Sequence, residues 1–105
     1  MARKESYTLN YDPLVDEHLR SIEPKYHSLI RETIEEQLLF EPETETKNRK
    51  PLRRPTKLGA RWELRFGPGN RFRVYYRVVE QEVQILAIGV KVRNQVFLGG
   101  EEVDL

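Results

Sequence analysis

The pattern of apolar and polar residues predicts four strands along this chain. In 60–66 and in 71–79 every second residue is apolar, which is typical of strands with one buried face. Segment 6–11 alternates in the same way near the start. Segment 83–89 is almost entirely apolar, as in a strand that is central in its sheet or covered on both sides. We therefore expect one strand early in the chain and three in its second half.

Helical spacing predicts two helices between the first strand and the other three. Asp12-Pro13 is typical of a helix start, with aspartate as the N-cap and proline in the first turn. Pro24 ends this helix, and an amphipathic pattern predicts a second one over 26–38. The order β-α-α-β-β-β predicts an α+β fold, with a helical hairpin on one face of a small, mainly antiparallel sheet.

Two segments have no periodic pattern. Residues 41–57 contain three prolines and change from acidic to basic, so we expect a long loop, which in a small domain is often functional. Residues 99–105 begin with two glycines and are otherwise rich in acidic residues, which predicts a flexible acidic tail. A length of 105 residues fits a single domain, 1–105.

Composition excludes several classes of protein. The chain has no cysteine, which excludes disulfide scaffolds and cysteine-based zinc sites. No apolar run approaches the roughly 20 residues that a membrane helix needs, and the first residues do not resemble a signal peptide. We therefore expect a cytoplasmic protein without a membrane partner.

The net charge of +1 conceals a strong segregation of charge. Residues 1–46 hold 5 basic and 11 acidic side chains, a net charge of −6. Residues 47–93 hold 13 basic and 3 acidic side chains, a net charge of +10, and the 3 acidic side chains of 94–105 give −3. Pairing within the fold is one explanation, but surface ion pairs contribute little to stability. A basic middle therefore favours an anionic partner.

The predicted strands place most of the central arginines on the face opposite the apolar residues. Guanidinium groups match phosphate oxygens, so a phosphodiester is the expected ligand. Tyr75 lies among these cations, where it is expected to stack on a base. The alternative is that Glu63 pairs with an arginine of the neighbouring strand. The predicted basic surface comprises Arg61, Arg65, Arg71, Arg73 and Arg77, followed by Lys91 and Arg93.

The residues alone point to no familiar nuclease site. Metal-dependent cleavage needs clustered carboxylates, and the basic region contains only Glu63, Glu80 and Glu82, so no metal or other cofactor is expected. His18 and His27 fall on or near the helices, where half-exposed helix residues are expected rather than an acid–base pair. RNA cleavage here would have to use cations to stabilise the phosphate and the 2′-hydroxyl of the RNA as nucleophile.

Three short motifs occur in this element order. They are Trp62-Glu63-Leu64-Arg65-Phe66, Arg71-Phe72-Arg73-Val74-Tyr75-Tyr76, and Ile85-Leu86-Ala87-Ile88-Gly89, the last followed by a basic turn. In this order and spacing the chain resembles the RelE/ParE superfamily of bacterial toxins, which are the toxin halves of type II toxin–antitoxin pairs. The resemblance covers about residues 7–98 and is strongest over 62–97.

The resemblance implies one of two activities. RelE-type members enter the ribosomal A site and cut mRNA without a metal, whereas ParE-type members inhibit DNA gyrase. In the RelE-type pattern, Arg73 matches the arginine that stabilises the scissile phosphate, and Arg65 matches a basic residue of the preceding strand. Lys91 or Arg93 matches the cation after the last strand, and Phe97 matches an aromatic residue near the C-terminus.

Two residues depart from the RelE-type pattern. Phe97 has no hydroxyl, so it can stack on the substrate but cannot relay a proton. Glu63 stands where some RelE-type nucleases carry a second lysine, and there it would either repel phosphate or serve as the base. The resemblance also implies a cognate antitoxin that covers the basic surface. The acidic tail is a weaker candidate for the same task.

These observations lead to one expected function and two alternatives. We expect a ribosome-dependent mRNA endonuclease, an mRNA interferase that inhibits translation. A gyrase inhibitor and an RNA-binding domain without toxicity remain as alternatives. The expected catalytic residues are Arg73, Lys91 and Arg93. The expected RNA-binding residues are Arg61, Arg65, Arg71, Tyr75, Arg77 and Phe97.

Overall fold

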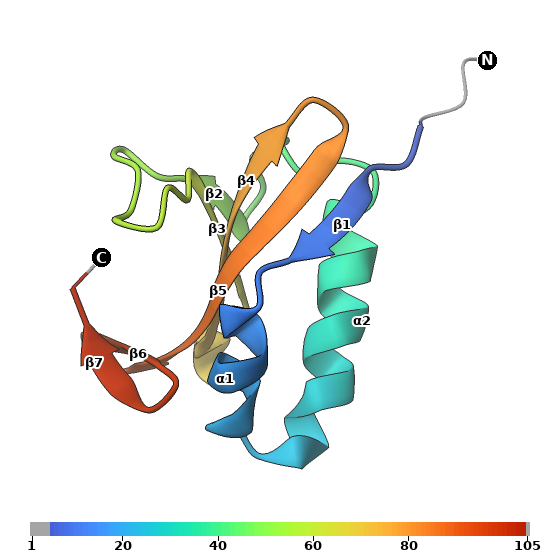
Figure 1. Cartoon of the computed structure of the whole chain (residues 1–105). Coiled ribbons are helices and arrows are strands. Elements are labelled where there is room, and N and C mark those ends of the chain that lie inside the picture. Colours follow the sequence, from blue (N-terminus) through green and yellow to red (C-terminus); the bar gives the residue numbers. More distant parts are fainter. Residues whose placement is uncertain (1–4, 105) are drawn as a thin grey trace.

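A curved, mostly antiparallel sheet of seven strands carries two α-helices on one face (Figure 1). The structure is a computed structural model and describes residues 5–104. The fold class is therefore α+β, as the sequence predicts. In chain order the elements are β1 (Thr8–Tyr11), α1 (Leu14–Arg20), the 3₁₀ turn η1 (Pro24–Tyr26), α2 (His27–Leu38), β2 (Arg49–Pro51), β3 (Trp62–Phe66), the 3₁₀ turn η2 (Pro68–Asn70), β4 (Phe72–Val79), β5 (Glu82–Val92), β6 (Gln95–Leu98) and β7 (Glu101–Val103).

Strand β5 organises the sheet. Along one edge it pairs with β4 in antiparallel register. Along its other edge, the first part of β5 pairs in parallel with β1 and the last part pairs antiparallel with β6. The remaining strands extend the sheet at both ends, in the order β2-β3-β4-β5-β6-β7. Both faces of β5 are covered, which explains its nearly continuous apolar sequence.

The main core lies between the helices and the sheet. Strands β3 and β4 contribute their predicted apolar faces, and Leu64 lies opposite Val74 with both side chains fully buried. Helix α2 buries Ile30, Ile34 and Leu38, which recur at helical spacing. The alternation predicted over 60–66 and 71–79 is therefore confirmed for this face of the sheet.

Polar side chains form hydrogen bonds with backbone groups at the ends of the two helices. Helix α1 begins one residue later than predicted, with Pro13 rather than Asp12 as the N-cap, and the Asp12 carboxylate accepts a hydrogen bond from the backbone N–H of Leu14 at 2.9 Å. Between the helices, His27 Nε2 lies 2.8 Å from the carbonyl oxygens of both Leu19 and Ile22. Within residues 5–104, no helix has the length and apolar character that crossing a membrane requires.

His18 is more deeply placed than the sequence predicts. Its side chain is 7% exposed, and its Nδ1 accepts a hydrogen bond from the backbone N–H of Ile88 at 3.2 Å. The register between β4 and β5 shifts close to this point. Tyr75 pairs with Ala87, whereas the next residue, Tyr76, pairs with Ile85. Burial lowers the pKa of His18 below its usual value. The expected half-exposed helix histidine is instead a buried link between α1 and β5.

Three short strands were not predicted. Strand β2 lies within the predicted loop 41–57, and β6 and β7 form a hairpin after β5. The hairpin turn uses Gly99 and Gly100 at φ angles of 61° and 84°, which glycine adopts at little cost. The segment 99–105, predicted as a flexible tail, thus contains a paired strand, and its last residue, Leu105, lies outside the described residues. These strands are ordered by pairing with a neighbour rather than by their own alternation.

Candidate nucleic-acid interface

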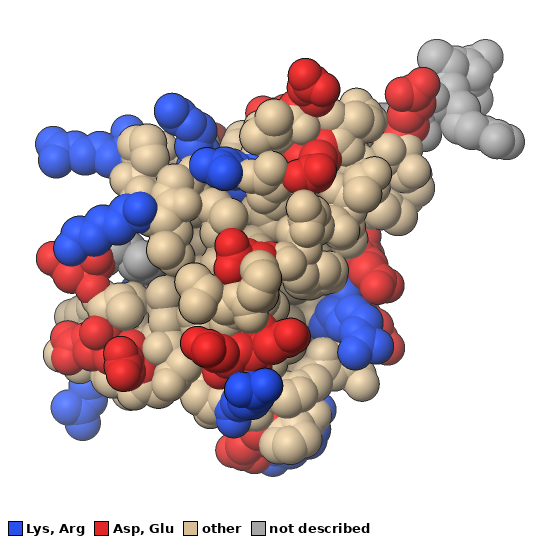
Figure 2. All heavy atoms as spheres, in the orientation of Figure 1, with Lys and Arg blue, Asp and Glu red and all other residues tan. Residues whose placement is uncertain are grey.

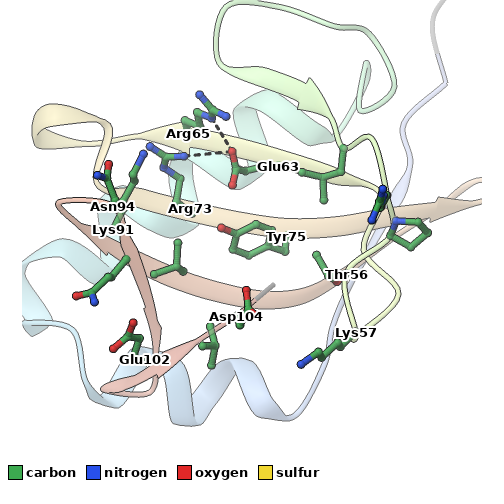
Figure 3. Close-up of a pocket in the computed structure, with 16 residues that line it drawn as sticks. Thr56, Lys57, Glu63, Arg65, Arg73, Tyr75, Lys91, Asn94, Glu102 and Asp104 are labelled. Carbon is green, nitrogen blue, oxygen red and sulfur yellow. Dashed lines mark hydrogen bonds and ion pairs between the residues drawn. The ribbon is translucent and has the colours of Figure 1, made fainter.

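The face of the sheet away from the helices is hollowed into an open groove of about 1000 Å³ (Figure 3). Strands β3 and β4 form its floor. One wall is the loop that follows β2, here called the basic loop (residues 52–58), and another is strand β7. Because this loop and β7 come from opposite ends of the strand order, the groove follows from the curvature of the sheet.

A small apolar cluster supports the groove from below. It places Tyr75 among Ala60, Leu86 and Ala87, with side chains from the basic loop and from β6 packed against it. The β6–β7 hairpin approaches β5 closely at Gly89, where a Cβ would lie 2.9 Å from a methyl carbon of Leu98. The walls of the groove are therefore packed onto its floor, and both are parts of the folded sheet.

Glu63 lies at the centre of the floor between two arginines. Its Oε1 accepts hydrogen bonds from Arg65 Nε at 2.5 Å and from Arg73 Nη1 at 3.2 Å. The strand register explains this arrangement, because Arg65 and Arg73 face each other across β3 and β4. Glu63 and Arg73 are 6% and 7% exposed, and the backbone carbonyl oxygen of Asn70 accepts a further hydrogen bond from Arg73 Nε at 3.0 Å.

The burial of this charged centre costs folding free energy, and the centre keeps a net positive charge. Burying an ion pair requires the removal of water from both ions, so such a pair contributes little to stability compared with apolar packing. Two guanidinium groups share a single carboxylate here, so one positive charge is left uncompensated. The alternative predicted for Glu63, pairing with an arginine of the neighbouring strand, is confirmed by its contact with Arg73.

Tyr75 does not act as the exposed stacking platform that the sequence predicts. Its side chain is 2% exposed and is covered by the apolar cluster of the groove floor. Burial, and after it the negative charge of Glu63, raises the pKa of Tyr75 above its usual value, so the phenol stays protonated at neutral pH. A base cannot stack on a ring that is covered on both sides.

The walls of the groove carry charges of opposite sign. Arg54 and Lys57 of the basic loop line one side, and Glu102 and Asp104 of the C-terminal hairpin line another. Figure 2 shows Lys and Arg gathered over the basic loop, with Asp and Glu over the hairpin below it. Lys91, from the end of β5, lies beside Arg73 at the edge of the floor (Figure 3).

The groove brings together four of the predicted site residues, Arg65, Arg73, Tyr75 and Lys91. Arg77 projects elsewhere, since its Nε donates to Gln84 Oε1 at 2.5 Å beside a separate small hollow. Arg61 is exposed just before β3 and does not line the groove. The same holds for Arg93, which has a φ angle of 58° in the turn between β5 and β6.

Neither Arg71 nor Phe97 lines the groove, contrary to the prediction. The guanidinium carbon of Arg71 lies 4.9 Å from the ring centroid of Tyr26, on the helix side of the sheet. Arg71 follows the turn η2 and precedes β4, so the strand alternation that would have aligned it with Arg73 does not reach it. Phe97 of β6 does not line the groove, although its neighbour Val96 does.

Sequence reasoning missed the residues of the walls. The basic run 53–57 and the acidic run 101–104 were visible as charge clusters, and the acidic tail was expected only as a weak cover for the basic surface, not as a wall of a groove. Among residues 5–104, no group of three or more His, Cys, Asp or Glu side chains is arranged to hold a metal ion. The site is thus defined by its cations and by the carboxylate that two of them share.

The geometry suits the binding of a polyanion. Arg73 and Lys91 can hold a phosphate, and Glu63 can accept a proton beside it. Lys57 and Arg54 can contact further phosphates along the basic wall. Comparison of the chain with protein-family models, with curated proteins and with solved structures finds no match.

Proposed function

We propose that this protein is the toxin of a type II toxin–antitoxin pair and that it cuts mRNA in the A site of the ribosome. The observation that carries this proposal is the Glu63 carboxylate held between Arg65 and Arg73 on the floor of an open groove. The order of elements and the motifs that resemble the RelE/ParE superfamily support it as well. The proposed partners are mRNA on the ribosome and a cognate antitoxin that covers the groove.

The proposed reaction uses the RNA as its own nucleophile. The 2′-oxygen attacks the adjacent phosphorus, and its proton passes to Glu63. The bond from phosphorus to the 5′-oxygen breaks, and Lys91 donates a proton to that leaving oxygen. The products are a 2′,3′-cyclic phosphate and a free 5′-hydroxyl. Arg73 stabilises the negative charge that develops on the phosphoryl oxygens.

The surroundings of Glu63 suit it to the role of base. One carboxylate oxygen is fixed by both arginines, and the other points away from them toward Tyr75 (Figure 3). A base that is oriented before the substrate binds needs little rearrangement during the reaction. The two guanidinium groups also outweigh the single carboxylate charge, which removes the expected repulsion between Glu63 and a phosphate.

Primer extension on an mRNA in a reconstituted translation mixture tests this function. We expect the wild-type protein to cut within codons, and only when ribosomes are present. Arg73→Ala and Glu63→Gln should lower cleavage by about 100-fold or more, because each removes a group that acts in the transition state. Arg77→Ala is the matched control, since Arg77 lies on the same strand outside the groove, and it should cut like the wild type.

Two other results would identify the alternative functions. Intact mRNA together with inhibited supercoiling by DNA gyrase would contradict the nuclease and favour the ParE-type activity. Intact mRNA together with binding to free RNA that requires Arg73 would favour an RNA-binding domain. The observation that favours the RNA-binding domain is the burial of Arg73 against Glu63 and Asn70.

A further inference from the structure

The groove contains carboxylates that the proposed reaction does not use. Glu102 and Asp104 line it together with Lys57 and Lys91. Both carboxylates belong to exposed residues, and neither forms an ion pair with another described residue. In Figure 3 they lie on the β7 side of the groove, across Tyr75 from Glu63. A surface that binds RNA thus has one wall that repels phosphate.

The acidic wall is held in place by the fold. Strand β7 pairs with β6 through Val96 and Val103, and both of these side chains line the groove. Strand β6 in turn pairs with the end of β5, next to Lys91. Strand pairing therefore fixes the backbone of Glu102, and Asp104 follows directly after the paired strand.

We propose that Glu102 and Asp104 make the groove selective for single-stranded RNA over duplex RNA. This inference rests on the proposed function, because it assumes that RNA lies in the groove. A flexible single strand can place all of its phosphates along the basic loop, Arg73 and Lys91. A duplex is stiff and carries a second backbone on the far side of its base pairs. That backbone would meet the acidic wall, where like charges repel.

Binding measurements on matched RNAs test the proposal. The probes are a fluorescently labelled RNA of about 12 nucleotides and the blunt duplex made from it and its complement, without ribosomes. We expect the wild-type protein to bind the single strand at least about tenfold more tightly at low salt. The double variant Glu102→Gln/Asp104→Asn should bind the duplex about three- to tenfold more tightly than the wild type, with less than about a twofold change for the single strand.

A charge-matched control separates local repulsion from a change in net charge. Glu32→Gln/Glu36→Gln removes the same number of carboxylates from exposed positions of α2, outside the groove. This control should keep the wild-type preference for the single strand. Equal gains for both RNAs in the Glu102/Asp104 variant, or no gain for the duplex, would overturn the proposed selectivity while RNA binding itself remained. Failure of the folded wild-type protein to bind either RNA would overturn the RNA-binding role and the selectivity together.

Discussion

The two faces of the sheet follow different physical rules. On the helix side, apolar residues of β3, β4 and β5 pack against α1 and α2 and exclude water. On the groove side, a cluster of only four buried apolar residues supports charged side chains, and Glu63 and Arg73 are buried among them. The neighbours Tyr75 and Tyr76 show the contrast, because adjacent positions of one strand serve opposite faces.

This difference separates stability from function. Hydrophobic burial on the helix side provides most of the folding free energy, since it scales with the apolar area removed from water. The groove side contributes less folding free energy, because it buries a charged centre in a fixed geometry instead of apolar side chains. Changes to the helix side should therefore act mainly on stability, and changes to the groove should act mainly on the proposed RNA binding and cleavage.

The largest expected difference between the faces concerns leucine side chains. Leu64→Ala on the helix side should lower the free energy of unfolding by about 3 kcal/mol, because it leaves a cavity in a fully buried position. Leu52→Ala, in the half-buried groove wall, should cost about 1 kcal/mol. Urea denaturation of both variants measures the difference. Equal losses would show that the groove side is as important for folding as the helix side.

The two adjacent tyrosines provide a smaller and sharper comparison. Tyr76→Phe should cost about 1.5 kcal/mol of folding free energy, because the Tyr76 hydroxyl donates to the Pro42 carbonyl oxygen at 2.6 Å and its loss leaves a buried acceptor unpaired. Tyr75→Phe should cost about 0.5 kcal/mol, since its hydroxyl faces the groove and Glu63. The same denaturation experiment measures both. A larger loss for Tyr75→Phe would reverse the comparison.

The helix side also has one pH-sensitive point. The pKa of His18 is lowered in the folded state, so below its usual value of 6.5 the unfolded chain binds a proton that the folded chain does not. The stabilisation is complete above pH 6.5 and decreases as the pH falls, by at most about 1.4 kcal/mol per pH unit. Stability curves between pH 7.5 and 5.5 for wild type and His18→Gln test this. Identical slopes would exclude His18 as the cause.

The smallest expected effect on stability concerns the acidic wall. Glu102→Gln/Asp104→Asn should change the free energy of unfolding by less than about 0.5 kcal/mol, because both residues are exposed and form no ion pair with other described residues. Thermal unfolding at neutral pH measures this change. A loss above about 1 kcal/mol would show that the carboxylates hold the hairpin in place.

The sequence predicted the helix side well because packing there repeats a simple period. The alternation of Trp62, Leu64 and Phe66 depends only on which face is buried, and the structure confirms it. The groove depends instead on where strands begin and which strands pair. Arg71 shows this: the turn η2 delays the start of β4 by one residue, and Arg71 leaves the predicted basic face.

The walls of the groove could not be predicted from the local sequence pattern for a different reason. Strand β7 spans only Glu101–Val103 and has no alternation of its own, so its position follows from pairing with β6. The basic loop and β7 meet across the groove only because the whole sheet curves. Glu63 was recognised as unusual, but the cross-strand register was needed to place two arginines on its carboxylate.

The parallel pairing of β1 with β5 has a consequence for the order in which the chain can fold during its synthesis. Thr8 pairs with Glu82, so β1, although made first, has no partner strand until most of the chain has been translated. The apolar face of α1 becomes covered only when the same strand has been made, since α1 packs against β5. Contacts between such distant parts of a chain form slowly, because a long loop must close before they are gained. A nascent chain stalled before residue 82 would therefore expose the apolar face of α1 and lack a complete sheet, so truncated translation products should be degraded.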